Sequence, residues 1–332
     1  MAKVLALILA VVTLSSCSAE FKAAGPAVTE PRWSDDHWLA ADGSRLPVRA
    51  WMPAGSPRAV VLALHGMNDY SNAFDGPGKA LAARGIAVYA YDQRGFGAGP
   101  HPGWWSSTET MADDARTAIG LLHTRHPGVA VVVLGESMGG AVAIEALKGA
   151  NPPAVAGLIL SAPAVWGRSS MGVVQRAALW LSYQIAPGWT LTGRGLKIRP
   201  SDNIEMLIAL SRDPLVIKGT RVDAIHGLVD LMDAAEADIA ALELPVLALY
   251  GANDEVIPPE PAWDAIARLP HRGAGQRAAY YPNGWHMLLR DLQARVVLDD
   301  IAAWIADPAQ PLPSGADRLA TEKLVSIESD AR

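Results

Sequence analysis

Short, wholly apolar segments recur along this chain of 332 residues, and they limit the folds that it can adopt. Each has the length of a strand that is buried on both faces, and segments with helical periodicity lie between them. The predicted strands of this kind cover residues 59–64, 86–91, 129–134, 155–160 and 246–250, and a last strand is predicted over residues 276–281. The predicted helices cover residues 72–84, 111–123, 138–147 and 286–305. This alternation predicts an α/β fold in which helices flank both faces of a mostly parallel central sheet.

One long stretch interrupts the alternation. Residues 166–240 contain helical patterns, at 171–185 and 223–239, and no convincing strand. We therefore expect a helical cap, inserted after the sixth predicted strand, over the carboxyl ends of the strands, where open α/β sheets bind ligands. An additional packing layer without a gating role is the alternative.

The rest of the chain divides around this insertion. A predicted hairpin, residues 38–41 and 46–52 around the turn Asp42-Gly43-Ser44, opens the core. The predicted α/β core comprises residues 32–165 and 241–306, and residues 307–332 are predicted to form a loose C-terminal tail, with a short terminal helix as the alternative.

The N-terminal residues have the pattern of a segment that is removed from the mature protein. Lys3 precedes an apolar run over residues 4–14 that is too short to span a bilayer. The sequence Leu14-Ser15-Ser16-Cys17 then resembles the lipobox of bacterial lipoproteins, and Cys17 is the only cysteine. We expect residues 1–17 to be a lipoprotein-type signal peptide, with lipidation at Cys17 and a tether over residues 18–31. An ordinary secretory signal is the alternative.

Two further features bear on location and partners. Ser18 follows the cysteine where an Asp would favour retention in the inner membrane, so the predicted location is the outer membrane of a bacterial cell envelope. The chain carries 28 Lys plus Arg residues against 34 Asp plus Glu residues, a net charge of −6, and no basic block. This balance predicts no nucleic-acid partner, and the sequence leaves the oligomeric state open.

The strongest chemical signal is Gly135-Glu136-Ser137-Met138-Gly139, which matches the pattern G-x-S-x-G. It follows a predicted buried strand and precedes a predicted helix, the context that a nucleophile elbow requires. The sharp turn strains the backbone of the serine, and the glycines leave room for that turn. Ser137 is therefore the predicted nucleophile, and an incidental serine in a strand–helix turn is the alternative.

A serine hydroxyl needs a base, and among the eight histidines His286 has the best position. It lies just past the last predicted strand, on a glycine-bearing loop that can reach across the sheet, and its place after Ser137 fits the known chain order of serine, acid and histidine. Asp254, on the turn after the strand 246–250, is the predicted acid that orients the imidazole. The adjacent Glu255 is its competitor.

The oxyanion of an acyl-transfer reaction needs two backbone donors. The amide of Met138, the residue after the nucleophile, is the first predicted donor. The second is the amide of Met67, on the loop His65-Gly66-Met67-Asn68 after the strand 59–64. This chemistry needs no metal and no organic cofactor.

These motifs together resemble the monoacylglycerol lipase and lysophospholipase branch of the α/β-hydrolases, which is grouped with serine aminopeptidase S33-type hydrolases. The matching segments are His65-Gly66-Met67, Asp92-Gln93-Arg94-Gly95-Phe96-Gly97, Gly135-Glu136-Ser137-Met138-Gly139-Gly140, Ser211-Arg212-Asp213-Pro214-Leu215-Val216, Gly251-Ala252-Asn253-Asp254 and Trp285-His286. Glu136 departs from the pattern, since many relatives carry His before the nucleophile. The cap is the family's most variable part, and the cap determines the substrate.

The resemblance implies an α/β-hydrolase fold with a helical cap, a Ser-Asp-His triad and hydrolysis of small or lipid-like esters, such as monoacylglycerol or lysophospholipid, through an acyl-enzyme. Apolar residues in or near the cap are predicted to form an acyl-binding pocket, with packing of the cap onto the core as the alternative. They are Trp166, Met171, Trp180 and Trp189. Two other functions stay open: a serine aminopeptidase-like amide hydrolase acting on short peptides, and a non-catalytic envelope lipoprotein.

Overall fold

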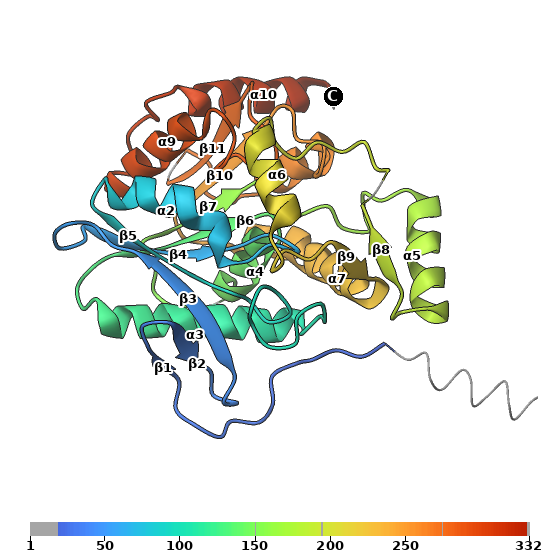
Figure 1. The fold of residues 1–332 in the computed structure, drawn as a ribbon. Coiled ribbons are helices and arrows are strands. Elements are labelled where there is room, and N and C mark those ends of the chain that lie inside the picture. Colours follow the sequence, from blue (N-terminus) through green and yellow to red (C-terminus); the bar gives the residue numbers. More distant parts are fainter. Residues whose placement is uncertain (1–18, 150, 194, 274, 331–332) are drawn as a thin grey trace, which may run out of the picture.

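The computed structural model describes residues 19–149, 151–193, 195–273 and 275–330, so the predicted signal peptide and Cys17 lie outside the described residues. Its centre is a nine-stranded sheet with the order β1-β2-β3-β5-β4-β6-β7-β10-β11 (Figure 1). The strands are β1 (Arg32–Trp33), β2 (His37–Leu39), β3 (Arg45–Trp51), β4 (Ala59–Leu64), β5 (Ile86–Tyr91), β6 (Val131–Glu136), β7 (Gly157–Ser161), β10 (Val246–Gly251) and β11 (Gln276–Tyr281). The strands from β5 to β11 in this order run parallel, and β1, β2 and β3 add an antiparallel edge.

The central strands are buried on both faces, which is why their sequences are apolar throughout. Along β4, Val60 and Leu62 face one layer of the core and Val61 faces the other. The helices are α2 (Asp75–Ala82), α3 (Thr108–Arg125), α4 (Met138–Leu147), α5 (Val173–Ile185), α6 (Ile204–Arg212), α7 (Val222–Asp238), α8 (Pro259–Ala267), α9 (Ala294–Ala306) and α10 (Ala316–Asp330), with 3-10 turns η1 (Ser71–Phe74) and η2 (Ile239–Ala241). Helices α2 and α9 cover one face of the sheet, and α3, α4, α7 and α8 cover the other.

The predicted fold class is confirmed, and the central elements lie where the sequence places them. The bounds of β4, β5, β11 and α4 agree with the prediction, and those of β6, β7 and β10 agree to within two residues. The predicted last helix is wrong at its start, because α9 begins only at Ala294. The residues before it are held in turns by bonds that a helix does not make: the Met287 amide donates to the Pro200 carbonyl at 2.9 Å.

The insertion between β7 and β10 differs from the prediction in two ways. It contains an antiparallel ribbon of β8 (Thr190–Thr192) and β9 (Gly219–Arg221), which lies outside the main sheet. The expected absence of strands was therefore wrong, because strands this short carry too little periodicity to be recognised. Helix α7 packs against α4 in the core, so we use "cap" below for residues 166–221 alone. The cap follows β7, since the short β1 adds one strand to the predicted count.

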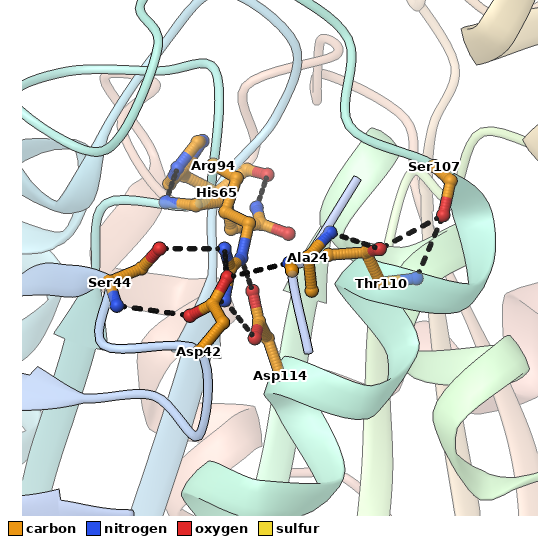
Figure 2. Close-up of polar contacts among 10 residues, drawn as sticks. Ala24, Asp42, Ser44, His65, Arg94, Ser107, Thr110 and Asp114 are labelled. Carbon is orange, nitrogen blue, oxygen red and sulfur yellow. Dashed lines mark hydrogen bonds and ion pairs between the residues drawn. The ribbon is translucent and has the colours of Figure 1, made fainter. Parts of the chain in front are cut away.

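The described part of the predicted tether is docked on the body. It forms no regular element, but the Lys22 amide donates to the Trp105 carbonyl at 2.8 Å, and the Val28 amide donates to the Ala41 carbonyl at 2.7 Å. The Ala24 amide donates to Thr110 Oγ1 at 3.1 Å (Figure 2). The backbone of this segment therefore follows the protein surface.

The predicted loose C-terminal tail is wrong as well. Helix α10 packs along the edge strand β11 and buries Ala316 and Ala320. An ion pair from Arg277 to Asp317, 2.5 Å long, joins the strand to the helix. Because an edge strand exposes unpaired backbone groups, a helix that covers it has a structural role that the helix's own polar composition does not reveal.

Arg94 joins three segments of the core that are far apart in the sequence (Figure 2). Its Nε donates to Asp114 of α3 at 2.7 Å, and its Nη1 donates to Asp42 of the opening hairpin at 2.7 Å. The three side chains are at most 9% exposed. Burial works to raise the pKa of Asp42, but the hydrogen bonds from Arg94 and the backbone hold that pKa below its usual value. The pair formed by Arg94 and Asp42 therefore stays ionised across the neutral pH range.

We expect Arg94→Met to lower the free energy of unfolding by about 3–5 kcal/mol, because it leaves two buried carboxylates without a counter-charge. Urea unfolding followed by circular dichroism measures this change. The control is Arg318→Met, whose side chain is 73% exposed and pairs only with exposed Glu322; it should change stability by less than about 1 kcal/mol. A similar loss of unfolding free energy in both variants would contradict the role of Arg94 as the counter-charge of the two buried carboxylates.

Candidate active site

Ser137 lies on the turn between β6 and α4, and its backbone is strained. Its φ is 54° and its ψ is −116°, angles that a non-glycine residue adopts only when its surroundings impose them. The Ser137 amide donates to the Ser161 carbonyl at 2.9 Å, and the Ser137 carbonyl accepts the Ala164 amide at 3.0 Å. A methyl group on Gly135 would lie 2.4 Å from the carbonyl oxygen of Gly139, so the motif's first glycine permits the close approach.

Asp254 and His286 form a buried pair. Nδ1 of His286 lies 2.8 Å from Oδ2 of Asp254, and the two side chains are 7% and 0% exposed. The other carboxylate oxygen accepts the amides of Val256 and Ile257 at 2.8 and 2.9 Å. The carboxylate is therefore fixed, and it orients the imidazole. Within the described residues, Nε2 of His286 has no protein partner and is available to a second group.

The competing acid, Glu255, points elsewhere: it is exposed, and it accepts the amide of Arg199 at 2.6 Å. The turns that carry the acid and the base touch each other. The Asn253 amide donates to the Gly284 carbonyl at 2.9 Å, and a methyl group on Gly251 would lie 2.6 Å from that carbonyl. The glycines on both turns thus let Asp254 reach His286.

Ser137, Asp254 and His286 follow the carboxyl ends of β6, β10 and β11, which run parallel and so end at the same edge of the sheet. A further contact brings the loops of the serine and the histidine together, since Arg290 donates to Glu136, the residue before the serine, at 2.6 Å. In the described part of the chain no hydrogen bond joins the Ser137 hydroxyl to the imidazole. The structure therefore pairs the acid with the base, and the action of the base on the serine stays a prediction.

The two predicted oxyanion donors lie next to the serine. Met138 is the first residue of α4, where an amide has no acceptor inside the helix. The loop of Met67 packs on the serine, because a methyl group on Gly66 would lie 3.4 Å from the Cβ of Ser137. Among the described residues, the Met67 amide donates to no protein acceptor. Both amides are free to bind a ligand oxygen, and this role stays a prediction.

His65 holds the Met67 loop from the core side (Figure 2). Its Nδ1 lies 2.9 Å from the Gly66 carbonyl oxygen, and its Nε2 accepts the Gln93 amide at 3.0 Å. Burial lowers the pKa of His65, which favours the neutral imidazole that these two bonds require. The Gly66 carbonyl and the Met67 amide belong to one planar peptide unit, so this bond also sets the direction of the Met67 N–H.

Sequence reasoning missed a buried ionic cluster beside the serine. The Arg290 guanidinium donates to Asp69 at 2.7 Å and to Glu136 at 2.6 Å. These side chains are at most 9% exposed. Burial disfavours the charge of the arginine, but Glu136 and Asp69 raise the pKa of Arg290 above its usual value. The signal that pointed to this cluster was Glu136 itself, because a carboxylate at the end of a buried strand needs a cation.

The four apolar residues predicted to form an acyl pocket are not brought together. Trp180 and Trp189 are 61% and 69% exposed, whereas Trp166 and Met171 pack against the core. None of them lines the cap groove, a cavity of about 730 Å³ beside the β8–β9 ribbon. The groove is lined by Asn68, Thr190, Leu191, Thr192, Gly193, Leu196, Thr220 and Ile225. The acyl-binding role of these four residues therefore stays a prediction.

A second groove, of about 620 Å³, lies between α2, α6 and the start of α9. It meets the ionic cluster at Asp69 and Arg290. Neither Ser137 nor His286 is among the lining residues of this groove or of the cap groove. The described residues contain no group of three or more His, Cys, Asp or Glu side chains placed to hold a metal ion.

Known sequences similar to this chain include lipases. The family described as "Serine aminopeptidase, S33" matches residues 55–293. A monoacylglycerol lipase of Mycolicibacterium smegmatis is 28% identical over 82% of this chain and 96% of its own length. The human monoglyceride lipase is 25% identical over 81% of this chain and 89% of its own length.

Solved structures with the same fold include two further lipases. The monoacylglycerol lipase of Paleococcus ferrophilus matches with a TM-score of 0.66 and 22% identity, over 78% of this chain and 98% of its own. A soluble variant of the monoglyceride lipase of Saccharomyces cerevisiae, in complex with a substrate analogue, matches with a TM-score of 0.68 and 18% identity, over 88% of this chain and 99% of its own. At these identities the likeness shows the fold.

We expect Arg290→Met to lower the free energy of unfolding by about 3–5 kcal/mol, because it leaves Asp69 and Glu136 buried without a cation. Removing all three charges, in Asp69→Asn, Glu136→Gln and Arg290→Met together, should be less destabilising than the single change. Urea unfolding measures both, with Arg295→Met as a control whose side chain is 89% exposed. A triple variant that is less stable than Arg290→Met would contradict the role of charge.

Proposed function

The chain belongs to the serine aminopeptidase S33 family of α/β-hydrolases, and from this premise we propose that it cleaves monoacylglycerol-like esters with Ser137, His286 and Asp254. It is a carboxylic ester hydrolase of the monoacylglycerol lipase type, as its relatives are. The observation that carries the proposed mechanism is the buried Asp254–His286 bond of 2.8 Å at the sheet edge where the strained Ser137 turn lies.

The proposed reaction has two steps. The Ser137 hydroxyl attacks the ester carbonyl carbon while Nε2 of His286 takes its proton, and the same nitrogen then protonates the departing alcohol. In the second step His286 deprotonates a water molecule, which attacks the acyl group on Ser137. The bond to Ser137 Oγ then breaks, His286 returns the proton to that oxygen, and the acid is released. Asp254 stabilises the imidazolium, and the Met67 and Met138 amides bind the oxyanion in both steps.

A fluorophosphonate probe, which labels activated serines, tests this proposal. Wild-type protein should be labelled, and Ser137→Ala should not be. Asp254→Asn should lower kcat on p-nitrophenyl esters by about 10⁴-fold, because it leaves the imidazole in the wrong tautomer. Ser326→Ala, an exposed serine on α10, serves as the control and should be labelled like the wild type. Labelling of Ser137→Ala would overturn the assignment of the nucleophile.

The contacts of the cap favour an ester substrate over a peptide. An aminopeptidase would use a cap carboxylate to bind a free amino terminus. No Asp or Glu is among the described residues that line the cap groove, and Asp213 of the cap accepts the Tyr70 hydroxyl at 2.7 Å. The cap groove instead offers Leu191, Leu196 and Ile225, side chains suited to an acyl chain. Turnover of monoacylglycerols, lysophospholipids and aminoacyl anilides by the purified protein separates the three substrate classes, and the probe experiment separates all of them from a non-catalytic lipoprotein.

Membrane association is the second part of the proposal. No helix in the described ranges is long and apolar enough to cross a bilayer. Helix α5 nevertheless exposes an apolar surface: Val173 and Val174 are 70% and 82% exposed, and Trp180, Leu181 and Ile185 are each at least 50% exposed. Such a surface suits contact with lipid, and a lipid anchor on Cys17 would hold the protein beside the bacterial outer membrane. Mass spectrometry of the mature N-terminus tests the anchor, since a cut elsewhere than before Cys17 would refute it.

We expect Val173→Ser with Val174→Ser to weaken flotation of the protein with phospholipid vesicles and to lower turnover of vesicle-bound monoacylglycerol several-fold. The reason is that the pair presents exposed apolar area to the bilayer, at about 25 cal/mol per Å² buried. Turnover of soluble p-nitrophenyl acetate should be unchanged. The control is Val325→Ser on α10, where the side chain is 60% exposed. Equal flotation of both variants and the wild type would contradict the assignment of this surface.

A further inference from the structure

The cap is bonded directly to the loop that carries the predicted oxyanion donor. The side-chain Nδ2 of Asn68, the residue after Met67, donates to Oγ1 of Thr220 at 2.7 Å. The Ile217 amide donates to the Asn68 carbonyl at 2.9 Å. Two residues further along, the Tyr70 hydroxyl donates to Asp213 at 2.7 Å. Three bonds thus run between the loop and one cap segment, residues 213–220.

Asn68 stands where the backbone favours glycine. Its φ is 66°, in the left-handed region that side chains other than Asn and Asp rarely adopt. Glycine would adopt this conformation without strain, but it would supply no bond to the cap. In the described structure the Oδ1 atom of Asn68 is buried without a partner, so the bond to Thr220 is the only one that the side chain makes.

The Met67 amide therefore lies between two anchors. His65 holds the Gly66 carbonyl from the core, and Asn68 is held at its carbonyl and its side chain by the cap. The core anchor is fully buried, whereas Ile217 and Thr220 are only half-buried and belong to the insertion. Of the two anchors, the one in the cap is the one that can be released without unfolding the sheet.

We propose that Asn68 is a positioning residue through which the docked cap holds the Met67 amide in place for the oxyanion. This inference rests on the proposed function, because it assumes acyl transfer at Ser137. The cap groove is lined by both Asn68 and Thr220, so an acyl chain in the groove packs against the bonded pair. An acyl chain in the groove would then affect the position of the Met67 amide. The cap would thus select substrates through the rate of the chemical step as well as through their binding.

The test uses the full-length protein and a substrate too short to reach the groove, p-nitrophenyl acetate. Asn68→Gly keeps the backbone conformation and removes the bond, and Thr220→Val removes the acceptor with little change of shape. Each should lower kcat by about 10- to 100-fold with KM within about twofold, because a small displacement of an oxyanion donor costs rate and leaves ground-state binding intact. The rate of labelling by a fluorophosphonate should fall in parallel.

The kcat of the double variant, Asn68→Gly with Thr220→Val, should be no lower than that of the slower single variant, since both changes break the same hydrogen bond. The control is Thr124→Val on α3, whose hydroxyl bonds to the Gly120 carbonyl far from the site. It should match the wild type in kcat, and thermal unfolding should show that all variants are folded.

The outcomes separate the two proposals. If wild-type protein is not labelled, or if Ser137→Ala keeps its turnover, the proposed function fails. If the wild type is labelled through Ser137 but Thr220→Val has wild-type kcat, or the two changes multiply in the double variant, the function stands and the role of Asn68 is refuted. A rise in KM without a fall in kcat likewise refutes it, because the pair would then act only in binding.

Discussion

A serine held at a φ of 54° keeps that conformation only if its neighbours prevent it from relaxing. In this chain the restraint comes from strands on both sides of β6. The Ser137 amide is bonded to Ser161 at the end of β7, and the position of a Gly139 side chain would lie 2.0 Å from the Leu64 carbonyl at the end of β4. The strained turn therefore depends on three adjacent strands, β4, β6 and β7. The burial of these strands on both faces stabilises the fold enough to offset the strain at Ser137.

That dependence explains which parts of the fold could be predicted. Strands β4 and β5 were predicted with their observed bounds, because residues of a strand that faces two packed layers must be apolar at every position. The bounds of edge strand β11 and helix α4 were also predicted, although β11 begins with Gln276 and Arg277 and is only partly buried. Residues 190–192 and 219–221 pair only with each other and face solvent or the groove, so their strand structure leaves no alternation in the sequence. The length of helix α10 and its packing on β11 were missed for a related reason: the residues that it buries include small alanines, which give only a weak hydrophobic pattern in a polar segment.

The same distinction holds for the site. Ser137, Asp254 and His286 stand on turns directly after strands, where motif and topology coincide, and the Asp254–His286 bond was predictable from that coincidence. Arg290 and Asp69 are separated by 221 residues and share no motif, so their bond could be read only from the coordinates. The acyl-binding role of Trp166, Met171, Trp180 and Trp189 stays a prediction. The exposure of Trp180 could not be read from the sequence, because it depends on which side of α5 meets the core, and α5 buries none of its side chains.

The ionic cluster also bears on the electrostatics of acyl transfer. The cluster pairs one guanidinium, that of Arg290, with two carboxylates, those of Asp69 and Glu136, so it has a net negative charge beside the serine when both carboxylates are ionised. In the proposed mechanism, such a charge would stabilise the imidazolium that forms when His286 takes the serine proton, as the charge of Asp254 would. It would oppose the oxyanion that forms at the same moment. Stabilisation of that oxyanion must then come from donors that are close and well aligned, because backbone dipoles lose strength with distance faster than the opposing charge does. If the Met67 amide is the proposed oxyanion donor, its direction should therefore matter more here than it would beside a serine with no charged cluster next to it. That direction is held by the bond of His65 on one side and by the bonds of Asn68 to the cap on the other.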